Sequence, residues 1–172
     1  MLLLVGLGNP GSDYTNTRHN IGFKIIDAIN SHFKLSKQKP KFKGLLTTGN
    51  IDEKKIYAIK PLTFMNNSGT AIKELIDYFK IDAKDVIVFH DDMDIDFGKI
   101  KAKFGGSSAG HNGIESIDKF IGKDYSRVRI GIGHPKQKKK VNNHVLEDFK
   151  EDEEEKIKEI TENIVKQIPT LI

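Results

Sequence analysis

The chain has 172 residues, 37% of them hydrophobic and 30% charged, which is typical of a soluble globular protein with one domain over residues 1–172. It has no cysteine, which excludes a disulfide framework, a thiolate nucleophile and a cysteine-bound metal. No run approaches the roughly 18 apolar residues of a membrane span, and no signal peptide is recognisable, so we expect a cytoplasmic protein without a membrane segment. The net charge of +4 indicates a polyanionic partner only weakly.

A long loop of unusual composition follows the first apolar run, which predicts a strand over residues 1–8. The loop, GLGNPGSDYTNTRHNIG at positions 6–22, is rich in glycine and asparagine and contains a histidine. Glycine permits tight turns, while asparagine and histidine supply hydrogen bonds and proton transfer. We therefore expect a functional loop. A helix predicted over residues 20–33 follows, with Asn20 as its N-cap.

A hairpin and a second unusual loop come next. After a polar, basic connector at 35–41, the segments 42–48 and 55–59 predict two strands joined by a turn at 49–52. The second loop is KPLTFMNNSG at 60–69. It leads into an amphipathic helix, for which Ser68 is the predicted N-cap.

The second half of the chain continues to alternate strands and helices. The run DVIVFH at 85–90 predicts a strand buried on both faces, and it ends in HDDMDIDFG. Residues 99–104 alternate lysine with apolar residues, which predicts a half-exposed strand. A glycine-rich loop, GGSSAGHNG at 105–113, precedes a predicted helix from 114 to 121. A strand at 127–132, a basic loop and a helix at about 152–167 complete the pattern.

This alternation predicts an α/β domain with a central, partly parallel sheet. In such sheets ligands bind at the carboxyl ends of the strands. The unusual loops follow predicted strands, after Leu7, Ile59, Phe89 and Phe104. We therefore expect these loops to converge on a single site.

His19 is the candidate general base of that site. Its imidazole titrates near neutral pH, and Asp91 and Asp92 at the tip of the buried strand are candidates to orient it. A lone loop histidine is more often structural, so the hypothesis rests on this pairing. Because the chain has neither cysteine nor a G-x-S-x-G motif, we expect water to be the nucleophile.

Three asparagines, Asn9, Asn66 and Asn112, each lie in a different unusual loop. A single asparagine in a loop is explained by turn chemistry. Three in converging loops can instead bind an amide backbone and polarise a carbonyl group.

Two other interpretations of these motifs have weaker support. Gly6, Gly8 and Gly11 match G-x-G-x-x-G, but Pro10 and a continuing loop stand where a dinucleotide-binding helix should begin. The acidic run after His90 resembles a metal site, yet Phe97 and Lys103 occupy the calcium-loop positions that require Gly and Glu. A looser metal site there remains the minority hypothesis.

Basic residues concentrate in three segments. They are the lysine face of residues 99–103, the pair Arg127 and Arg129, and the stretch KQKKK at 136–140. Solvated strand faces explain such charge in most proteins. If the strands adjoin, the same residues form a phosphate-binding patch beside the site.

Taken together, the loops resemble bacterial peptidyl-tRNA hydrolases. GLGNPGSDYTNTRHNIG, KPLTFMNNSG, HDDMDIDFG, GGSSAGHNGIESI and RVRIGIGHP are similar to that family's motifs and occur in the family's order. The resemblance implies a three-layer α/β sandwich, with helices flanking a mixed, largely parallel twisted sheet. It also implies a monomer without metal or cofactor.

The resemblance further implies hydrolysis of the ester that joins a peptide to the 3′ ribose of tRNA. His19 matches the catalytic histidine, Asp91 its supporting carboxylate, and Asn9 the residue that distinguishes N-blocked from free aminoacyl-tRNA. Further residues match contacts to the peptide and the acceptor end of the tRNA: Tyr14, Phe64, Met65, Asn66 and Asn112. Lys103 and Arg129 match a pair that binds the tRNA 5′-phosphate.

Two hypotheses from other classes remain beside this one. The first is a nucleotide-binding oxidoreductase that uses the glycine loop, which titration with a nicotinamide cofactor would test. The second is a non-catalytic RNA-binding module, which offers no reason for a histidine and an aspartate at strand ends and lacks an aromatic stacking motif.

Overall fold

The computed structural model describes residues 1–135 and 141–172, so the predicted basic stretch at 136–140 lies outside the described residues. The strands are β1 (Leu2–Gly6), β2 (Lys39–Lys41), β3 (Gly44–Ile51), β4 (Lys54–Pro61), β5 (Val86–Asp92), β6 (Ile100–Phe104) and β7 (Ser126–Gly131). The helices are α1 (Ile21–His32), α2 (Ser68–Phe79), α3 (Asn112–Ile121), α4 (Val141–Leu146) and α5 (Glu151–Leu171). Short 3₁₀ turns include Arg18–Asn20 and Met65–Asn67.

The strands form one mixed seven-stranded sheet in the order β2-β3-β4-β1-β5-β7-β6. The four central strands, β4, β1, β5 and β7, are parallel to one another. Antiparallel pairs extend both edges, with β2 and β3 beside β4 and with β6 beside β7. Because the four central strands share one direction, their carboxyl ends lie together at one end of the sheet, where the predicted site should lie.

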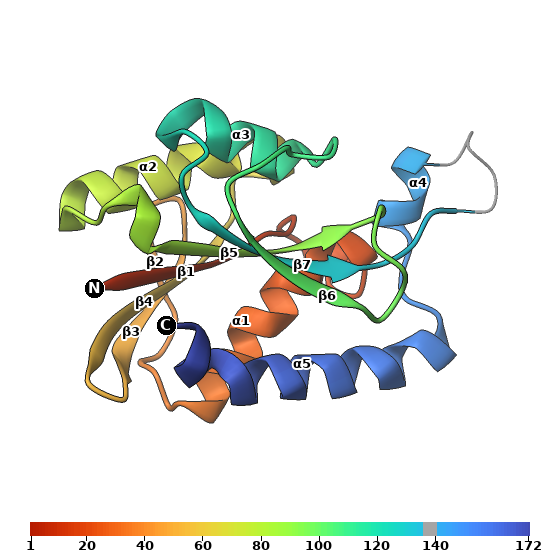
Figure 1. Ribbon diagram of the computed structural model, residues 1–172, viewed down its shortest axis with the longest axis horizontal. Coiled ribbons are helices and arrows are strands. Elements are labelled where there is room, and N and C mark those ends of the chain that lie inside the picture. The colour runs from red at the N-terminus through yellow and green to blue at the C-terminus, as the bar shows by residue number, and fades with distance from the viewer. Residues whose placement is uncertain (136–140) are drawn as a thin grey trace.

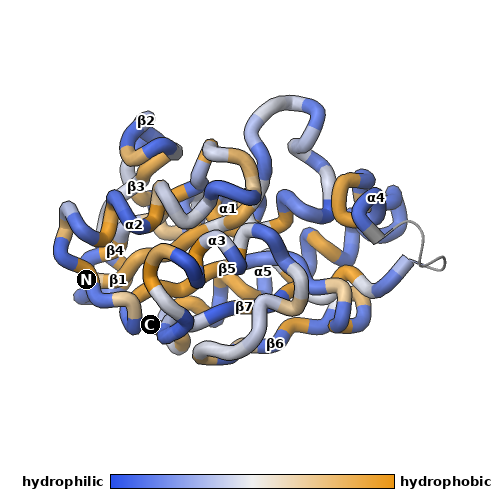
Figure 2. Tube along the Cα trace, turned by 90° about the horizontal axis from the view of Figure 1, so that it is seen from above, coloured by the Kyte–Doolittle hydropathy of each residue, from blue (hydrophilic) through white to orange (hydrophobic). Residues whose placement is uncertain are grey.

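Helices cover both faces of this sheet, with α2 and α3 on one side and α1 and α5 on the other (Figure 1). The alternation along β1 explains both layers, because Leu3 and Val5 pack toward α2 and α3 while Leu4 packs toward α1 and α5. The central strands form the hydrophobic middle of the molecule (Figure 2). The predicted three-layer α/β architecture is confirmed.

Three details of the sheet differ from the sequence prediction. The predicted connector contains a short exposed strand, β2, and the β3–β4 turn lies at Asp52, beyond the predicted glycine and asparagine. Strand β6 runs antiparallel to β7, so Phe104, the last residue of β6, pairs with Ser126, the first residue of β7. Phe104 therefore lies at the end of the sheet opposite the carboxyl ends of β5 and β7. The loop after Phe104 must therefore return along the molecule to reach the predicted site.

Asn20 stands at the predicted N-cap position of α1, but its side chain does not cap the helix. The predicted N-cap Ser68 is wrong, because Asn67 occupies that position of α2. The side chain of Asn20 bonds to the backbone of Asn9 and makes no capping hydrogen bond to α1. Ser68 is the first residue of α2, and its hydroxyl donates to the carbonyl of Met65. In each case a loop uses the polar side chain that the helix end was expected to use.

None of the described helices is long and apolar enough to span a membrane.

Candidate active site

His19 and Asp91 meet at the carboxyl edge of the sheet, as predicted. His19 lies in the 3₁₀ turn that precedes α1, and Asp91 lies near the end of β5. The Nδ1 atom of His19 is 2.9 Å from both carboxylate oxygens of Asp91. Because Asp91 faces Nδ1, the proton of a neutral His19 lies on Nδ1, and Nε2 retains the lone pair that a general base needs.

His111 is a second partner of Asp91, and sequence reasoning missed it. Its Nε2 atom is 2.9 Å from Oδ1 of Asp91. Its Nδ1 atom accepts from the backbone N–H groups of Gly113 and Ile114, so His111 is the N-cap of α3. A neutral His111 therefore carries its proton on Nε2 and donates it to Asp91.

These contacts set opposite pKa shifts on the two members of the pair. Burial lowers the pKa of His19, but the charge of Asp91 and its hydrogen bond outweigh burial and raise it above 6.5. Burial would raise the pKa of Asp91, but the two histidines hold it far below its ordinary value. Asp91 is therefore ionised throughout the neutral range, and His19 is a stronger base than a free imidazole.

A third histidine, His90, lies behind the pair. It is buried, and its ring is 4.9 Å from that of His111, centroid to centroid. Burial and the neighbouring His111 lower the pKa of His90 to about 3. His90 therefore stays neutral where His19 titrates, and it adds no charge to the site.

The group formed by His19, Asp91 and His111 also has the composition of a metal site, with ligand atoms within 4.8 Å of one another. The hydrogen bonds oppose that use. For His111 to ligate through Nε2, the proton would have to move to Nδ1, where two backbone N–H groups already point. In the acidic run after His90, two carboxylates are engaged elsewhere, because Asp92 binds Arg129 and Asp94 binds His134.

Asn9 is held rigidly at the start of the glycine loop. Its backbone N–H donates to Oδ1 of Asn20, and its carbonyl accepts from Nδ2 of the same residue. Its own Oδ1 accepts from the N–H of Met65 at 2.8 Å. The side-chain oxygen is thus committed to the neighbouring loop, which leaves the Asn9 NH₂ group to donate into the cleft that this residue lines.

The unusual loops line an open cleft of about 340 Å³ in front of these residues. Its walls contain the predicted set together with three residues of α4: Asn9, Tyr14, His19, Phe64, Met65, Asn66, Asn112, Asn142, Val145 and Leu146. Tyr14 and Phe64 form an edge-to-face pair at 6.4 Å, with Phe64 about half exposed at 52%. A second hollow beside Asp91 shares His19, Asn112, Asn142 and Val145.

The glycines of the first loop serve packing. A Cβ atom on Gly6 would lie 2.2 Å from the carbonyl oxygen of Gly22, and one on Gly8 would lie 2.8 Å from the ring of Phe23. They are therefore required for α1 to approach β1 closely, and that approach places His19 beside Asp91. Gly11, the last glycine of the G-x-G-x-x-G match, is followed by a short 3₁₀ turn, and α1 begins only at Ile21, so no dinucleotide-binding helix opens at that glycine.

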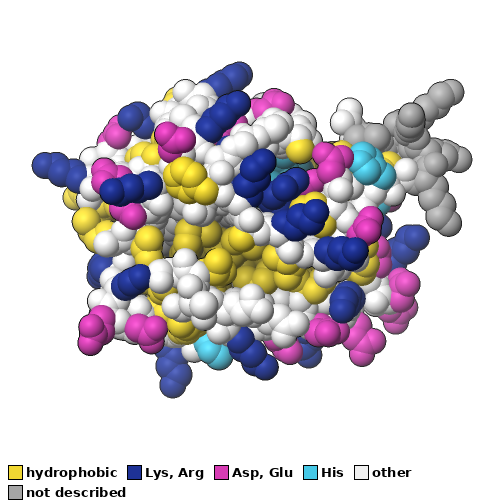
Figure 3. All heavy atoms as spheres, in the orientation of Figure 1, with side chains coloured by type: hydrophobic (Ala, Val, Ile, Leu, Met, Phe, Trp, Pro, Cys, Tyr) yellow, Lys and Arg dark blue, Asp and Glu magenta, His cyan; other side chains and the backbone are white. Residues whose placement is uncertain are grey.

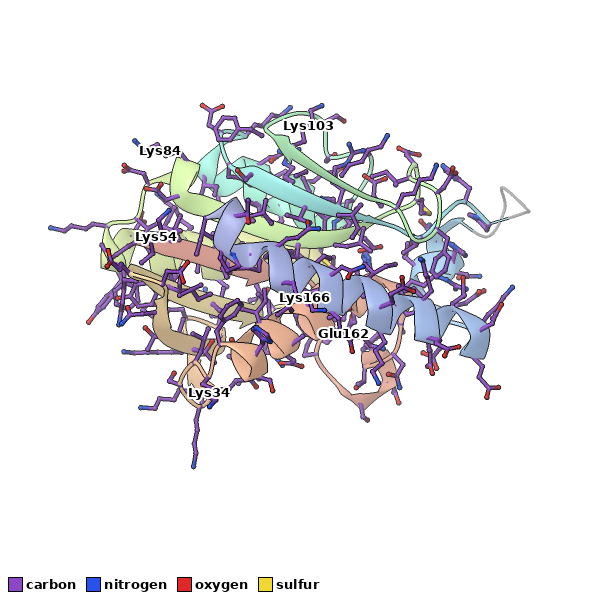
Figure 4. All side chains as sticks on the ribbon, turned by 60° about the horizontal axis from the view of Figure 1, so that its bottom comes forward. Lys34, Lys54, Lys84, Lys103, Glu162 and Lys166 are labelled. Atoms are coloured by element: carbon purple, nitrogen blue, oxygen red, sulfur yellow. The ribbon has the colours of Figure 1, made fainter. Side chains whose placement is uncertain are left out.

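The predicted basic patch forms in part. Strands β6 and β7 adjoin, and Lys103 and Arg129 are diagonal neighbours on the face opposite α1 and α5. The side chain of Arg129 is 23% exposed, and its Nε atom donates to the carboxylate of Asp92 at 2.8 Å. Asp92 directly follows Asp91 in the sequence. Lysine and arginine side chains gather along this part of the surface (Figure 3). Lys103 lies well away from Glu162 and Lys166 on α5 (Figure 4).

Arg127 is a correction to the predicted patch. It is only 2% exposed, and its guanidinium bonds to Asp118 and to the carbonyls of Gly106 and Ser107. Arg127 therefore anchors the loop after β6 to the sheet, and it offers no charge to a ligand.

Sequence reasoning missed His111 and the residues of α4 that line the cleft. His111 stands in the quoted motif GGSSAGHNG, but a histidine between glycines is typical of a turn, and its distance from Asp91 is a property of the fold. Residues 141–146 give too short a helical period to predict a helix.

The fold and the site define a class. A parallel sheet that presents a buried histidine–carboxylate pair in an open cleft is typical of α/β hydrolytic enzymes that activate water.

Comparison with known proteins specifies the family. The family model of peptidyl-tRNA hydrolase matches residues 3–172. A peptidyl-tRNA hydrolase of Pelagibacter ubique is 73% identical over 172 residues, covering 100% of this chain and 92% of that protein. One of Bartonella quintana is 48% identical, with 100% and 89% covered. The crystal structure of peptidyl-tRNA hydrolase from Acinetobacter baumannii superposes with a TM-score of 0.93 at 35% identity, over 98% of this chain and 87% of that one. The chain therefore belongs to the peptidyl-tRNA hydrolase family and is an enzyme of the hydrolase class.

Proposed function

We propose that the chain hydrolyses the ester between a peptide, or an N-blocked aminoacyl group, and the 3′ ribose of tRNA, which releases tRNA for reuse in translation. The observation that carries the proposal is the pairing of Nδ1 of His19 with buried Asp91, beside a cleft that His19 itself lines. The Nε2 lone pair is then available to a water molecule in that cleft.

In this mechanism His19 takes a proton from the water as the water oxygen attacks the ester carbonyl. The negative charge of Asp91 stabilises the imidazolium that forms. The tetrahedral intermediate collapses, the bond to the ribose oxygen breaks, and His19 returns the proton to that oxygen. Asn66 and Asn112, both exposed in the cleft, position the water and donate to the developing oxyanion.

Asn9 supplies selectivity for a blocked substrate. Its oxygen is committed to Met65, so its NH₂ group donates to an acceptor, such as the carbonyl of a peptide bond or N-acyl group. A free α-ammonium group is itself a donor and carries charge, so it meets a donor where it needs an acceptor. Replacing Asn9 by Asp should therefore lower the rate for the blocked substrate and narrow the preference for it.

The remaining predicted residues are assigned to substrate binding. Tyr14, Phe64 and Met65 line the cleft, where aromatic faces and a thioether suit peptide side chains or the terminal bases of the acceptor end. Lys103 and Arg129 bind the 5′-phosphate, and Arg129 is attached through Asp92 to the strand that carries Asp91. We expect the protein to act as a cytoplasmic monomer. Its substrate would be peptidyl-tRNA that has dissociated from the ribosome, from which it releases free tRNA.

The direct test is release of free tRNA from N-acetyl-aminoacyl-tRNA, with unblocked aminoacyl-tRNA as the control. The proposal predicts a strong preference for the blocked substrate, and it predicts that Asn9→Asp reduces the ratio of the two rates. Equal rates in the unaltered protein would contradict the role given to Asn9, and no release from either substrate would refute the function.

A further inference from the structure

Arg18, the residue before His19, connects the catalytic loop to α4. It is only 2% exposed although it carries a permanent charge. Its Nη1 atom donates to the carbonyl of His144 at 3.1 Å, and Nη1 also lies 3.4 Å from the carboxylate of Glu147. Its Nη2 atom donates to Glu153 at 3.0 Å. One guanidinium thus connects the last turn of α4 and the first turn of α5 to the residue beside the general base.

Backbone hydrogen bonds strengthen this connection. The N–H of Arg18 donates to the carbonyl of Glu147, and the N–H of Phe149 donates to the carbonyl of Asn16. Thr17 and Asp148 form an isolated antiparallel bridge between the same two segments. The segment after α4 therefore runs as a short extended pair alongside residues 16–18.

The helix positioned in this way forms one wall of the cleft. Asn142, Val145 and Leu146 line it together with Phe64, Met65 and Asn66. Helix α4 has only six residues, too few to be stable alone, and it stands at the same end of the sheet as the loop that carries His19 (Figure 1). Its position depends on its anchors, and Arg18 is the charged anchor that contacts both α4 and the segment after it.

We propose that Arg18 is a positioning residue that sets substrate affinity by holding α4 as a cleft wall at a fixed place relative to His19. This inference rests on the proposed function. Within the described residues, Arg18 makes no hydrogen bond to Asp91 and does not line the cleft. It acts on the substrate through Asn142, Val145 and Leu146, and it leaves the His19–Asp91 chemistry unchanged.

The test compares KM and kcat for N-acetyl-aminoacyl-tRNA hydrolysis in Arg18→Lys and Glu147→Gln. Lysine keeps the charge, but its single ammonium cannot reach His144, Glu147 and Glu153 with the forked geometry of arginine. We expect Arg18→Lys to raise KM about tenfold, with kcat changed less than about twofold. Glu147→Gln, at an exposed carboxylate, should raise KM by only about twofold. Glu153 is not a clean site, because it also accepts from the N–H of Lys150 at the start of α5.

A double-mutant cycle separates positioning from a general effect on folding. If Arg18 acts through α4, Val145→Ala should raise KM in the unaltered protein and raise it much less in the Arg18→Lys background. Asp77→Asn, which removes an exposed ion pair with Lys73 on α2, is the matched control and should leave KM unchanged. The pH profile of kcat should not move in any of these variants.

Three results would overturn the inference. An active Arg18→Lys variant with unaltered KM would show that the ion pairs serve stability alone. A fall in kcat with a displaced pH profile would show that Arg18 acts on His19 directly, and additive effects of Arg18→Lys and Val145→Ala would separate Arg18 from α4. Failure of the proposed function is distinguishable from all of these, because the unaltered protein would then release no tRNA.

Discussion

Among single residues, the charge of Asp91 matters most, because it sets the base strength of His19. In the proposed mechanism the general base works when His19 is neutral, so kcat/KM should rise with pH through the pKa of His19, which Asp91 holds above 6.5. In Asp91→Asn the raising influence is lost and burial remains, so the acid limb should move to lower pH while kcat falls. A pH series of both proteins measures this. An unmoved or alkaline-shifted limb in Asp91→Asn would contradict the account.

The same pair also predicts how stability varies with pH. A group whose pKa is raised by folding stabilises the folded state while it is protonated. The ion pair of His19 with Asp91 should therefore add its full stability below pH 6.5 and lose it as pH rises through the higher folded pKa. Denaturant titrations of the unaltered protein and of His19→Gln across this range would show it as a gap in the free energy of unfolding that narrows at alkaline pH.

His111 has two separable roles, which two substitutions distinguish. His111→Ala removes both the cap of α3 and the contact with Asp91, whereas His111→Asn retains a side chain that caps helices well. We expect His111→Ala to be about 1 kcal/mol less stable than His111→Asn. Both should have reduced kcat, because both lose the donor to Asp91. Full activity in His111→Asn would show that the contact with Asp91 is dispensable.

At the level of helices and strands, the close approach of α1 to the sheet holds the turn that carries His19 in place. A Cβ atom on Gly22 would lie 2.4 Å from the backbone nitrogen of Leu7 and 2.5 Å from the carbonyl oxygen of Phe89. Gly22→Ala should therefore push α1 away and cost about 1–3 kcal/mol of stability, with a loss of activity. Ser31→Ala, on the exposed side of the same helix, is the control. A stable and active Gly22→Ala would mean that the backbone adjusts without moving His19.

At the scale of the whole molecule, the cations on the β6–β7 edge predict how tRNA binding depends on salt. Lys103→Met and Arg129→Met should each weaken binding and reduce the slope of log K against log salt by about 1. Lys166→Met, on α5 and remote from the patch (Figure 4), should leave the slope unchanged. Binding isotherms over a salt series provide the slopes, and an unchanged slope in both patch variants would refute the phosphate contact.

The helices and strands with a clear hydrophobic period could be predicted from the sequence. Strand direction, capping partners and the burial of charged side chains could not, because they depend on contacts between distant segments. Apolar runs and helical spacing indicated the four parallel strands and four of the five described helices. The loops at strand ends indicated the convergence of His19, Asn9, Asn66 and Asn112 on one cleft, with Asp91 behind His19. The direction of β6 was not predictable, because alternating lysine and apolar residues suit either direction. Asn20 and Ser68 are good caps in isolation, but nearby loop backbone competes for them. The strand pattern predicts Arg127 as a surface cation, whereas the structure buries it against Asp118.

The most direct test of the central claim is the single-turnover rate of N-acetyl-aminoacyl-tRNA hydrolysis in His19→Ala, measured together with the Kd for the same substrate. The account predicts that loss of the general base lowers the rate by about 10²–10⁴-fold. The Kd should stay within about twofold of the unaltered value, because the cleft walls and Lys103 and Arg129 are unchanged. A near-normal rate at saturating enzyme would contradict the assignment of His19 as the group that activates water.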